Sequence, residues 1–399
     1  MPTVVVILPT TTYRAADFVR AAESIGVDLV VVSEHPSPIA MGDRYLQIEC
    51  GDPVEAAETI AALGERTPID GVVAADDQGV MVAAHAARLL GLRGNPPESA
   101  AATRDKLAMR RLLERAEVDQ PAFVELAPGT RPGDVAAPLG LPVVVKPVDR
   151  TASQGVIRAD SAEEIDAAVD RVRAIVGEQA TLLIEAFAPG AEVAIEGMVD
   201  EGELIVLAVF DKPDTSDGPY FPETIFVTPS RHPAAAQAEA ARVAAAAVRG
   251  LGLTHGPVHI ELRLEGDRAR VVEVAARSIG GLCSRSLNFG LMGTTLEALI
   301  LRNALGLRSS LSREPVASGV LMIPTPETGA LIRLSGDEEV RSIAGVTGID
   351  ITIPPGGEVV APPEGDRYLG FVYARAQHPD QVEETLRKAM AVLEVQVEG

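Results

Sequence analysis

The chain is poor in lysine, in aromatic residues and in cysteine. Only four of its 35 basic residues are lysines, aromatic residues make up 3% of the chain, and tryptophan is missing. Two cysteines, Cys50 and Cys283, are too few for a disulfide framework. No apolar run approaches the roughly 20 residues needed to cross a bilayer, and no secretory leader precedes the first predicted strand. We therefore expect a soluble cytoplasmic protein without structural disulfides.

Positive charge is also scarce, because 57 acidic residues leave the chain with a net charge of -22. Nucleic acids and anionic membranes favour basic surfaces, so neither is expected as a partner. An anionic ligand such as ATP would need a local cationic pocket. Since arginine supplies most of the positive charge, the interior lysines Lys106, Lys146 and Lys212 are candidates for compact charges that a guanidinium group does not replace.

The first part of the chain alternates short apolar runs with helical patterns. With 399 residues, of which 47% are hydrophobic, the chain is long enough for two or three domains. The predicted strands and helices alternate in the order 3–8, 15–25, 29–32, 53–63, 71–75 and 80–90. This order predicts a parallel sheet covered on both faces. Residues 10–12 and the pair Asp76 and Asp77 follow strands, where they either cap helices, as we favour, or contact an anion.

The most informative stretch covers residues 256–281, with the sequence GPVHIELRLEGDRARVVEVAARSIGG. It predicts a β-hairpin, and a three-residue loop at 266–268 would place Glu261 opposite Glu273. Like charges that face each other repel, so we expect a cation between these glutamates. Oxygen ligands favour Mg²⁺. The alternative is a solvated sheet face on which Arg263 and Glu265 also point outward.

An arginine and two glycines follow the second glutamate. Arg277 comes four residues after Glu273, and Gly280 and Gly281 allow the backbone to approach a ligand closely. An acid pair for Mg²⁺ beside an arginine that can hold phosphate is typical of nucleotide chemistry. This pattern resembles the ATP-grasp superfamily and, within it, the L-amino acid ligases and related carboxylate–amine ligases.

The resemblance extends over essentially the whole chain and implies an α/β and α+β fold. An N-terminal parallel-sheet, Rossmann-like domain would cover residues 1–95. A two-lobed ATP-grasp fold would cover residues 96–312, with the small lobe at about 108–187. A small C-terminal α+β domain, of the kind found in these ligases, would cover residues 313–399.

The resemblance implies which residues bind the phosphates of ATP. Lys106 and Lys146 would contact them, and Lys146 ends a buried apolar strand, where an ammonium group needs an anionic partner. Ser153, Gln154 and Gly155 belong to a small-residue loop whose backbone amides would fold over the phosphates. This loop has Thr-Ala-Ser where more glycine is usual in the family.

The same resemblance assigns the rest of the nucleotide site. Glu185 and the backbone of Ala186 and Phe187 would meet the adenine edge, and Glu192 would bind the ribose hydroxyls. Two strands joined by a Pro-Gly turn, with exposed acids, are the structural alternative for this stretch.

The metal and the chemistry fall on the hairpin and on one loop. Glu261 and Glu273 would bind Mg²⁺, or Mn²⁺ in its place. Lys212 begins a polar loop of the kind that forms lids, from which it could reach the transferred phosphate. Arg277 would stabilise the oxyanion or the departing phosphate. Ala275 stands where many family members have a metal-binding asparagine, so either the glutamates and phosphates hold the second metal or only one metal binds well.

Substrate contacts are expected from residues around this centre, namely Glu223, His259, Gly281, Arg285 and Asn288. For His259 a packed or hydrogen-bonded role is the favoured alternative. Small residues at 275 and 281 suggest room for a bulky substrate side chain. Family members often have a histidine three residues after the glutamate at 223, and the phenylalanine there implies a different substrate pocket.

These features predict an ATP-dependent ligase that joins a small carboxylate to an amine through an acylphosphate and releases ADP and phosphate. Two alternatives stay open. One is another ATP-grasp reaction, such as a bicarbonate-dependent carboxylation, and the other is a non-catalytic ATP-binding protein. The family resemblance and the acidic surface are compatible with a homodimer.

Overall fold

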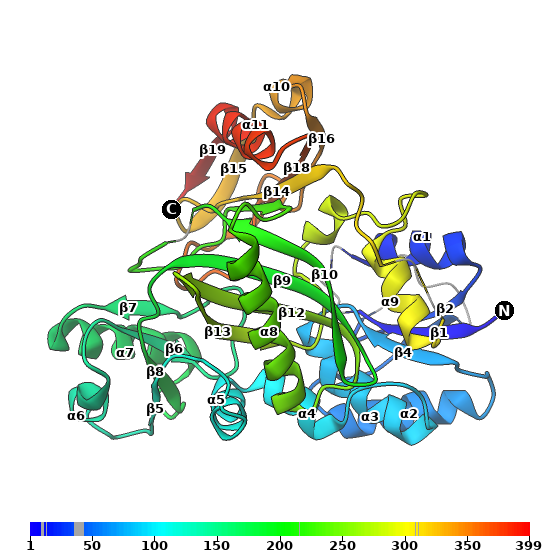
Figure 1. Cartoon of the computed structure of the whole chain (residues 1–399), viewed down its shortest axis with the longest axis horizontal. Helices are drawn as coiled ribbons and strands as arrows, with labels where there is room; N and C mark the ends of the chain where they lie inside the picture. Colours follow the sequence, from blue (N-terminus) through cyan, green and yellow to red (C-terminus); the bar gives the residue numbers. More distant parts are fainter. Residues whose placement is uncertain (9–11, 13, 36–43, 215, 308, 310) are drawn as a thin grey trace.

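The computed structural model describes the whole chain except residues 9–11, 13, 36–43, 215, 308 and 310, so the predicted contacts of residues 10 and 11 lie outside the described residues. Figure 1 shows a central sheet with the N-terminal part on one side, a small lobe on the other, and the C-terminal part above. The fold is mixed α/β, as the sequence predicted.

The N-terminal part is a parallel sheet with the strand order β3-β2-β1-β4. Its elements are β1 (Thr3–Ile7), α1 (Ala15–Ile25), β2 (Asp28–Ser33), β3 (Tyr45–Gln47), α2 (Pro53–Gly64), β4 (Gly71–Ala74), the 3₁₀ helix η2 (Asp77–Gly79) and α3 (Val80–Leu90). Both faces of β1 are buried, which explains its continuous apolar sequence. The predicted alternation of strands and helices is confirmed.

The small lobe is an antiparallel sheet with helices on one face. Helices α4 (Pro97–Arg104) and α5 (Lys106–Arg115) lead into it from the N-terminal part. Its strand order is β5-β8-β6-β7, and its elements are β5 (Phe123–Leu126), α6 (Pro132–Ala136), η3 (Ala137–Leu139), β6 (Val143–Pro147), β7 (Ile157–Ala159), α7 (Ala162–Val176) and β8 (Leu182–Ala186). Ser161 caps helix α7 by accepting from the Glu164 N–H, and the apolar face of this helix is buried over β6 and β7.

The central sheet is antiparallel, with the order β13-β12-β9-β10-β11-β14-β18-β16. Its strands are β9 (Ala191–Asp200), β10 (Glu203–Lys212), β11 (Ile225–Thr228), β12 (His255–Glu265), β13 (Arg268–Ala275), β14 (Ala317–Ile323), β16 (Val346–Ile351) and β18 (Gly370–Ala376). Helix α8 (Ala234–Leu251) packs on β13 and β10, and α9 (Leu296–Ala304), which follows η4 (Cys283–Ser286), packs on α1 and β4. Because β14, β18 and β16 continue this sheet, the C-terminal part is joined to the centre by strand pairing.

A second small sheet completes the C-terminal part. Its order is β17-β15-β19, and the elements are β15 (Gly329–Ser335), α10 (Asp337–Ser342), β17 (Glu358–Val359), α11 (Pro379–Val392) and β19 (Glu394–Glu398). Cys50 and Cys283 are both free, and Cys283 is buried. Among the helices of the described residues, none has the length and apolar character that a membrane span requires.

Candidate active site

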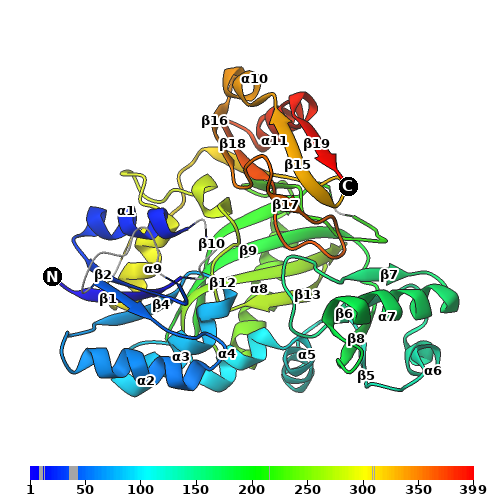
Figure 2. The ribbon, with the colours of Figure 1, turned by 180° about the vertical axis from the view of Figure 1, so that it is seen from behind.

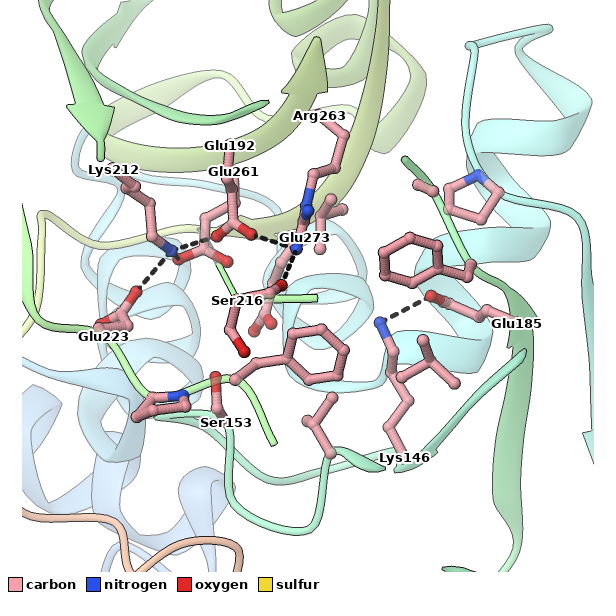
Figure 3. Close-up of a pocket in the computed structure, with 18 of the residues that line it drawn as sticks. Lys146, Ser153, Glu185, Glu192, Lys212, Ser216, Glu223, Glu261, Arg263 and Glu273 are labelled. Atoms are coloured by element: carbon pink, nitrogen blue, oxygen red, sulfur yellow. Dashed lines mark hydrogen bonds and ion pairs between the residues drawn. The ribbon is translucent and has the colours of Figure 1, made fainter. Parts of the chain in front are cut away.

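Two cavities meet at the hairpin of β12 and β13. The first lies between the small lobe and the central sheet, and Figure 3 shows its side chains. The second, with a volume of about 520 Å³, is bounded by the N-terminal part, the hairpin and residues 366–368. The side chains that line both cavities are Arg150, Ser153, Glu223, Glu261 and Glu273. A ligand in one cavity would therefore lie close to a ligand in the other.

Glu261 and Glu273 face each other across the hairpin, as predicted, but the route to this register differs. The turn consists of Gly266 and Asp267 only, so the predicted three-residue loop is wrong. A β-bulge at Val272 adds one residue to β13 and brings Glu273 opposite Glu261. The bulge therefore does what the longer loop was expected to do.

The solvated-face alternative fails for most of this hairpin. Arg263 is only 4% exposed and forms an ion pair of 2.9 Å with Glu192 on the neighbouring strand. Glu265, at the tip, is exposed and pairs with Arg270 at 2.8 Å. Charges are thus buried and paired toward the cavities, and only the tip faces solvent.

Glu261 is held ionised by two cations. Its Oε1 lies 3.4 Å from Lys212 Nζ and 3.8 Å from His259 Nε2. Burial alone would raise the pKa of Glu261, but Lys212 and His259 hold it well below its usual range. Burial opposes the charge of His259 as well, yet Glu196, at 3.1 Å, and Glu261 raise its pKa to about 9. At neutral pH these contacts favour a carboxylate beside an imidazolium.

Lys212 lies among acids at the end of β10. Its ammonium contacts Glu192, Glu223 at 2.9 Å and Glu261, as Figure 3 shows. Burial opposes its charge, but these carboxylates raise its pKa well above the usual value. Burial and the Glu261 carboxylate raise the pKa of Glu223, against the effect of Lys212. Two of these carboxylates have a second cationic partner, Arg263 for Glu192 and His259 for Glu261.

Lys146 pairs with Glu185 across strands β6 and β8. The Nζ–Oε2 distance is 2.6 Å, and Arg110 of α5 contacts the other oxygen of Glu185 at 2.5 Å. All three side chains are buried. Burial alone would raise the pKa of Glu185, but Arg110 and Lys146 lower it to about 2. Burial lowers the pKa of Lys146, with Glu185 opposing the shift.

Lys106 and Arg104 carry positive charge into the two different cavities. Lys106 Nζ donates to Glu273 Oε1 at 3.1 Å and lines the first cavity, whereas Arg104 lines the second. Between them, Asp105 caps α5 by accepting from two backbone N–H groups of its first turn. The extended Asp105 separates the two helices, so Arg104 ends α4 and Lys106 begins α5.

Arg277 is held by the N-terminal part of the chain. Its Nε donates to Asp77 Oδ2 at 2.9 Å, and Arg104 contacts the other oxygen of Asp77 at 3.1 Å. Burial alone would raise the pKa of Asp77, but Arg277 and Arg104 lower it. Because Arg104 and Arg277 share one carboxylate, this wall of the second cavity offers guanidinium N–H groups to an anion.

Three protein families match successive parts of this fold. The ATP-grasp N-terminal domain matches residues 19–94, the ATP-grasp domain residues 139–286, and the L-amino acid ligase C-terminal domain 2 residues 321–398. The chain belongs to the ATP-grasp superfamily and is L-amino acid ligase-like.

Individual relatives support this membership. Protein y4rH of Sinorhizobium fredii is 25% identical over 335 residues, which cover 82% of this chain and 68% of the relative. The alanine–anticapsin ligase of Bacillus amyloliquefaciens is 28% identical over 251 residues, 57% of this chain and 52% of the relative. The crystal structure of an L-amino acid ligase from Bacillus licheniformis matches with a TM-score of 0.81 at 24% identity, covering 100% of this chain and 99% of that one. The chain spans about half to two thirds of the length of the two curated relatives.

The ATP-grasp protein brings most of its predicted site residues to the cavities. The first cavity is lined by Lys106, Lys146, Ser153, Glu185, Ala186, Phe187, Glu192, Lys212, Glu223, Glu261 and Glu273. The second is lined by Ser153, Gln154, Glu223, His259, Glu261, Glu273, Arg277 and Gly281. Their predicted roles stay predictions, since the contacts described here are those of the protein alone.

Several contacts of the ATP-grasp protein differ from the expected ones. The carboxylate of Glu185 forms ion pairs with Arg110 and Lys146, so it is not available to the adenine edge. The backbone N–H groups of Ala186 and Phe187 donate to the carbonyls of Ala122 and Pro142, at 2.8 and 3.0 Å. An adenine in this cavity would therefore need acceptors and apolar contacts from this segment rather than those N–H groups.

Arg285 and Asn288 are held outside the two cavities. Arg285 pairs with Asp17 at 3.0 Å and with Asp350 at 2.7 Å, so it joins α1 to β16. Asn288 contacts the guanidinium of Arg375. Their expected substrate contacts are not supported by this arrangement.

Gly281 lines the second cavity, but its missing side chain has a packing reason. Its φ is 57°, and a Cβ there would lie 2.5 Å from the ring of Phe371. The glycine therefore allows close packing against Phe371, and it is weak evidence for a large substrate side chain.

Other residues at the second cavity were not found from the sequence. Arg14 is 1% exposed, donates to Ser278 Oγ at 2.8 Å and pairs with Glu297 at 2.9 Å, so it fixes the segment after Arg277. Tyr368 donates to Glu223 Oε2 at 3.1 Å across 145 positions of sequence. No local pattern marks either contact, because the partners are far apart in the chain.

The metal prediction was tested against the donors present. In the part of the chain that the structure describes, no group of three or more His, Cys, Asp or Glu side chains is arranged to hold a metal. Glu261 and Glu273 offer two facing carboxylates that line both cavities. These oxygen donors fit Mg²⁺, which keeps several ligands from water and phosphate. The site thus fits an ion shared with a nucleotide rather than one enclosed by protein.

Proposed function

We propose that this protein joins a small carboxylate to an amine with ATP as the energy source. The observation that carries the proposal is the pair of adjoining cavities with Glu261 and Glu273 at their junction. A nucleotide in the first cavity would place its last phosphate next to substrates in the second. The two substrates would be small molecules held in the larger, second cavity.

Nucleotide binding would fall on the first cavity. Lys106 and Lys146 would contact the phosphates, and the loop with Ser153 would cover them. Glu192 would bind the ribose hydroxyls. Glu261 and Glu273 would hold Mg²⁺, which neutralises phosphate charge and favours in-line attack when bound.

Chemistry would begin with the substrate carboxylate. One of its oxygens attacks the γ-phosphorus, the bond from that phosphorus to the β–γ bridging oxygen breaks, and ADP leaves with an acylphosphate in place. The amine nitrogen then attacks the acyl carbon, the C–O bond to the phosphate breaks, and the departing phosphate takes up the proton that the nitrogen loses. Arg277 donates to the oxyanion or to the departing phosphate, a contribution typically of about 10²- to 10³-fold in rate.

The test is ADP release by the purified protein with Mg²⁺ and ATP, across amino acids and other small carboxylates singly and in pairs, with mass spectrometry of products. Pair-dependent ADP release with a matching new amide mass supports the proposal. Bicarbonate-stimulated ADP release without an amide would point to a carboxylase-like reaction. ATP binding without turnover would point to a non-catalytic binding protein. The cytoplasmic location and the homodimer stay predictions.

A further inference from the structure

Residues 361–368 follow β17 and reach from the C-terminal part to the small lobe. Figure 2 shows this orange loop extending below β17 toward the small lobe. We propose that this segment, here named the strap, positions the loop 149–156 over a nucleotide in the first cavity and at the same time shapes the second cavity. The proposal rests on the proposed function in its account of coupling, and on structure alone in its account of the loop.

The strap binds the loop through its own backbone carbonyls. The N–H of Gly155 donates to the carbonyl oxygen of Pro363 at 2.7 Å. The side-chain amide of Gln154 donates to the carbonyl oxygen of Glu364 at 2.6 Å. These two adjacent strap residues therefore hold two adjacent loop residues. The Gly155 amide, which the sequence suggested for phosphate, is used by the strap instead.

A charged pair fixes the strap to a second element of the small lobe. Arg171 of α7 makes a bidentate contact with the carboxylate of Glu364, in which Nε donates at 2.7 Å and Nη2 at 3.1 Å. A two-pronged arginine–carboxylate contact fixes orientation as well as distance. Arg171 also donates to Tyr220 Oη at 2.8 Å, which links α7 to the lid-like loop before β11. The small lobe is thus attached to the strap at two separate places.

The other end of the strap belongs to the second cavity. Asp366, Arg367 and Tyr368 line it, and Tyr368 Oη donates to Glu223 Oε2 at 3.1 Å. Glu223 in turn lines both cavities and contacts Lys212 at 2.9 Å. One short segment therefore touches both the loop 149–156, which lines the two cavities, and the wall of the second cavity.

The strap is folded tightly, which suits a positioning role. The N–H of Gly365 donates to the carbonyl of Ala361 at 3.0 Å. A Cβ at Gly365 would lie 2.0 Å from the carbonyl oxygen of Val360, so only glycine fits this turn. A turn closed on itself loses little further entropy when it holds the loop.

The strap affects how closely ATP consumption is coupled to amide formation. A loop that opens during turnover would admit water to the acylphosphate, and hydrolysis would then consume ATP without amide formation. Glu364 is therefore a positioning residue, because it acts through the loop and touches neither substrate. Weakening its ion pair with Arg171 should raise the KM for ATP and lower the amount of amide formed per ADP.

The test compares Glu364→Gln with the matched control Glu239→Gln, which breaks a surface pair with Arg242 at 2.7 Å on α8. For Glu364→Gln we expect the KM for ATP to rise about two- to fivefold, the range for one exposed ion pair. The amount of amide formed per ADP should fall. In the presence of ATP and Mg²⁺, trypsin should cut this variant after Arg150 faster than it cuts the parent protein. The control should match the parent protein. The exchanged pair Arg171→Glu with Glu364→Arg should restore all three values, namely the KM for ATP, the amide formed per ADP and the rate of cleavage after Arg150.

Two results would contradict the proposed role of the strap. One is a Glu364→Gln variant that equals the control in KM, coupling and cleavage after Arg150. The other is a change that the exchanged pair does not restore, which would indicate loss of packing alone. The cleavage assay needs ATP binding and no turnover, so it judges the strap even if the ligase proposal fails.

Discussion

At the scale of single residues, the proposed function depends most on Glu261 and Glu273, the carboxylates at the junction of the two cavities. Glu273→Gln keeps the shape of the side chain but removes the charge that pairs with Lys106 at 3.1 Å. We expect turnover to fall below detection because the proposed Mg²⁺ site would lose one of its two carboxylates, while the unfolding temperature changes little. Steady-state ADP release and thermal unfolding measure the two effects.

The matched control is Glu265→Gln at the exposed tip of the same hairpin, which should keep full activity. Full activity of Glu273→Gln across a Mg²⁺ titration would remove the metal assignment. Loss of activity in both variants would indicate that the hairpin as a whole had been disturbed.

The buried group of Lys146, Glu185 and Arg110 predicts a pH-dependent stability. The pKa of Glu185 is about 2 in the folded protein against an ordinary value of 4.5. Its ionised form therefore contributes stability that is fully present above about pH 5 and is lost as the pH falls toward 2. Glu185→Gln should lower the free energy of unfolding at pH 7 by about 3 kcal/mol.

Urea unfolding at a series of pH values checks this. The difference in free energy of unfolding between Glu185→Gln and the parent protein should shrink steadily below pH 5. The control Glu178→Gln changes an exposed residue before the same strand and should show no such trend. A difference that is constant from pH 7 to pH 3 would contradict the assignment of charge to this group.

At the scale of elements, helix α8 sets the position of the hairpin. It is rich in alanine because it packs closely on β13, where Ala240, Ala244 and Ala247 are fully buried. Ala244→Leu should therefore destabilise the protein by about 1–3 kcal/mol, since the added volume has no space. Ala238→Leu, on the exposed face of the same helix, should be close to neutral. Equal unfolding midpoints of the two variants in urea would contradict this packing.

How far the sequence predicts the elements depends on how local their causes are. The helices at 15–25 and 80–90 were predicted to the residue because their apolar spacing and terminal glycines are local signals. The hairpin turn was predicted one residue too long, because the bulge at Val272 depends on pairing with β12. Strands β15 and β19 were missed, since half of their residues face solvent and the apolar signal is weak.

At the scale of the whole molecule, the N-terminal part contributes to the second cavity. Asp77 holds Arg277 and Arg104, and its partners come from other parts of the chain. Asp77→Asn should lower kcat by about 10- to 100-fold, because displacing a catalytic group by about 1 Å costs that much. The KM for ATP should stay close to its normal value, since Asp77 does not line the first cavity.

The control is Asp70→Asn, whose only described side-chain bond is from the Thr3 N–H at 2.8 Å near the start of the same sheet. Steady-state kinetics with ATP and both substrates varied separate kcat from KM. A normal kcat in Asp77→Asn would show that Arg277 is positioned without the N-terminal part.

The candidate site was predictable where its residues lie in one stretch and not where distant segments meet. The facing glutamates and Arg277 lie within 17 residues of each other, so a hairpin was expected to bring them together, although the actual register depends on the bulge at Val272. Arg14, Asp77 and the strap reach the site from both ends of the chain. The sequence holds no pairing rule for such contacts, and only the folded arrangement reveals them.

The most direct test of the central claim follows oxygen atoms from substrate to phosphate. The carboxylate substrate is labelled with ¹⁸O in both oxygens, and the products of a complete reaction with ATP, Mg²⁺ and the amine are analysed by mass spectrometry. The account predicts one labelled oxygen in inorganic phosphate and one in the amide, because the carboxylate attacks the γ-phosphorus. Amide formation with unlabelled phosphate, or with label in AMP, would contradict it.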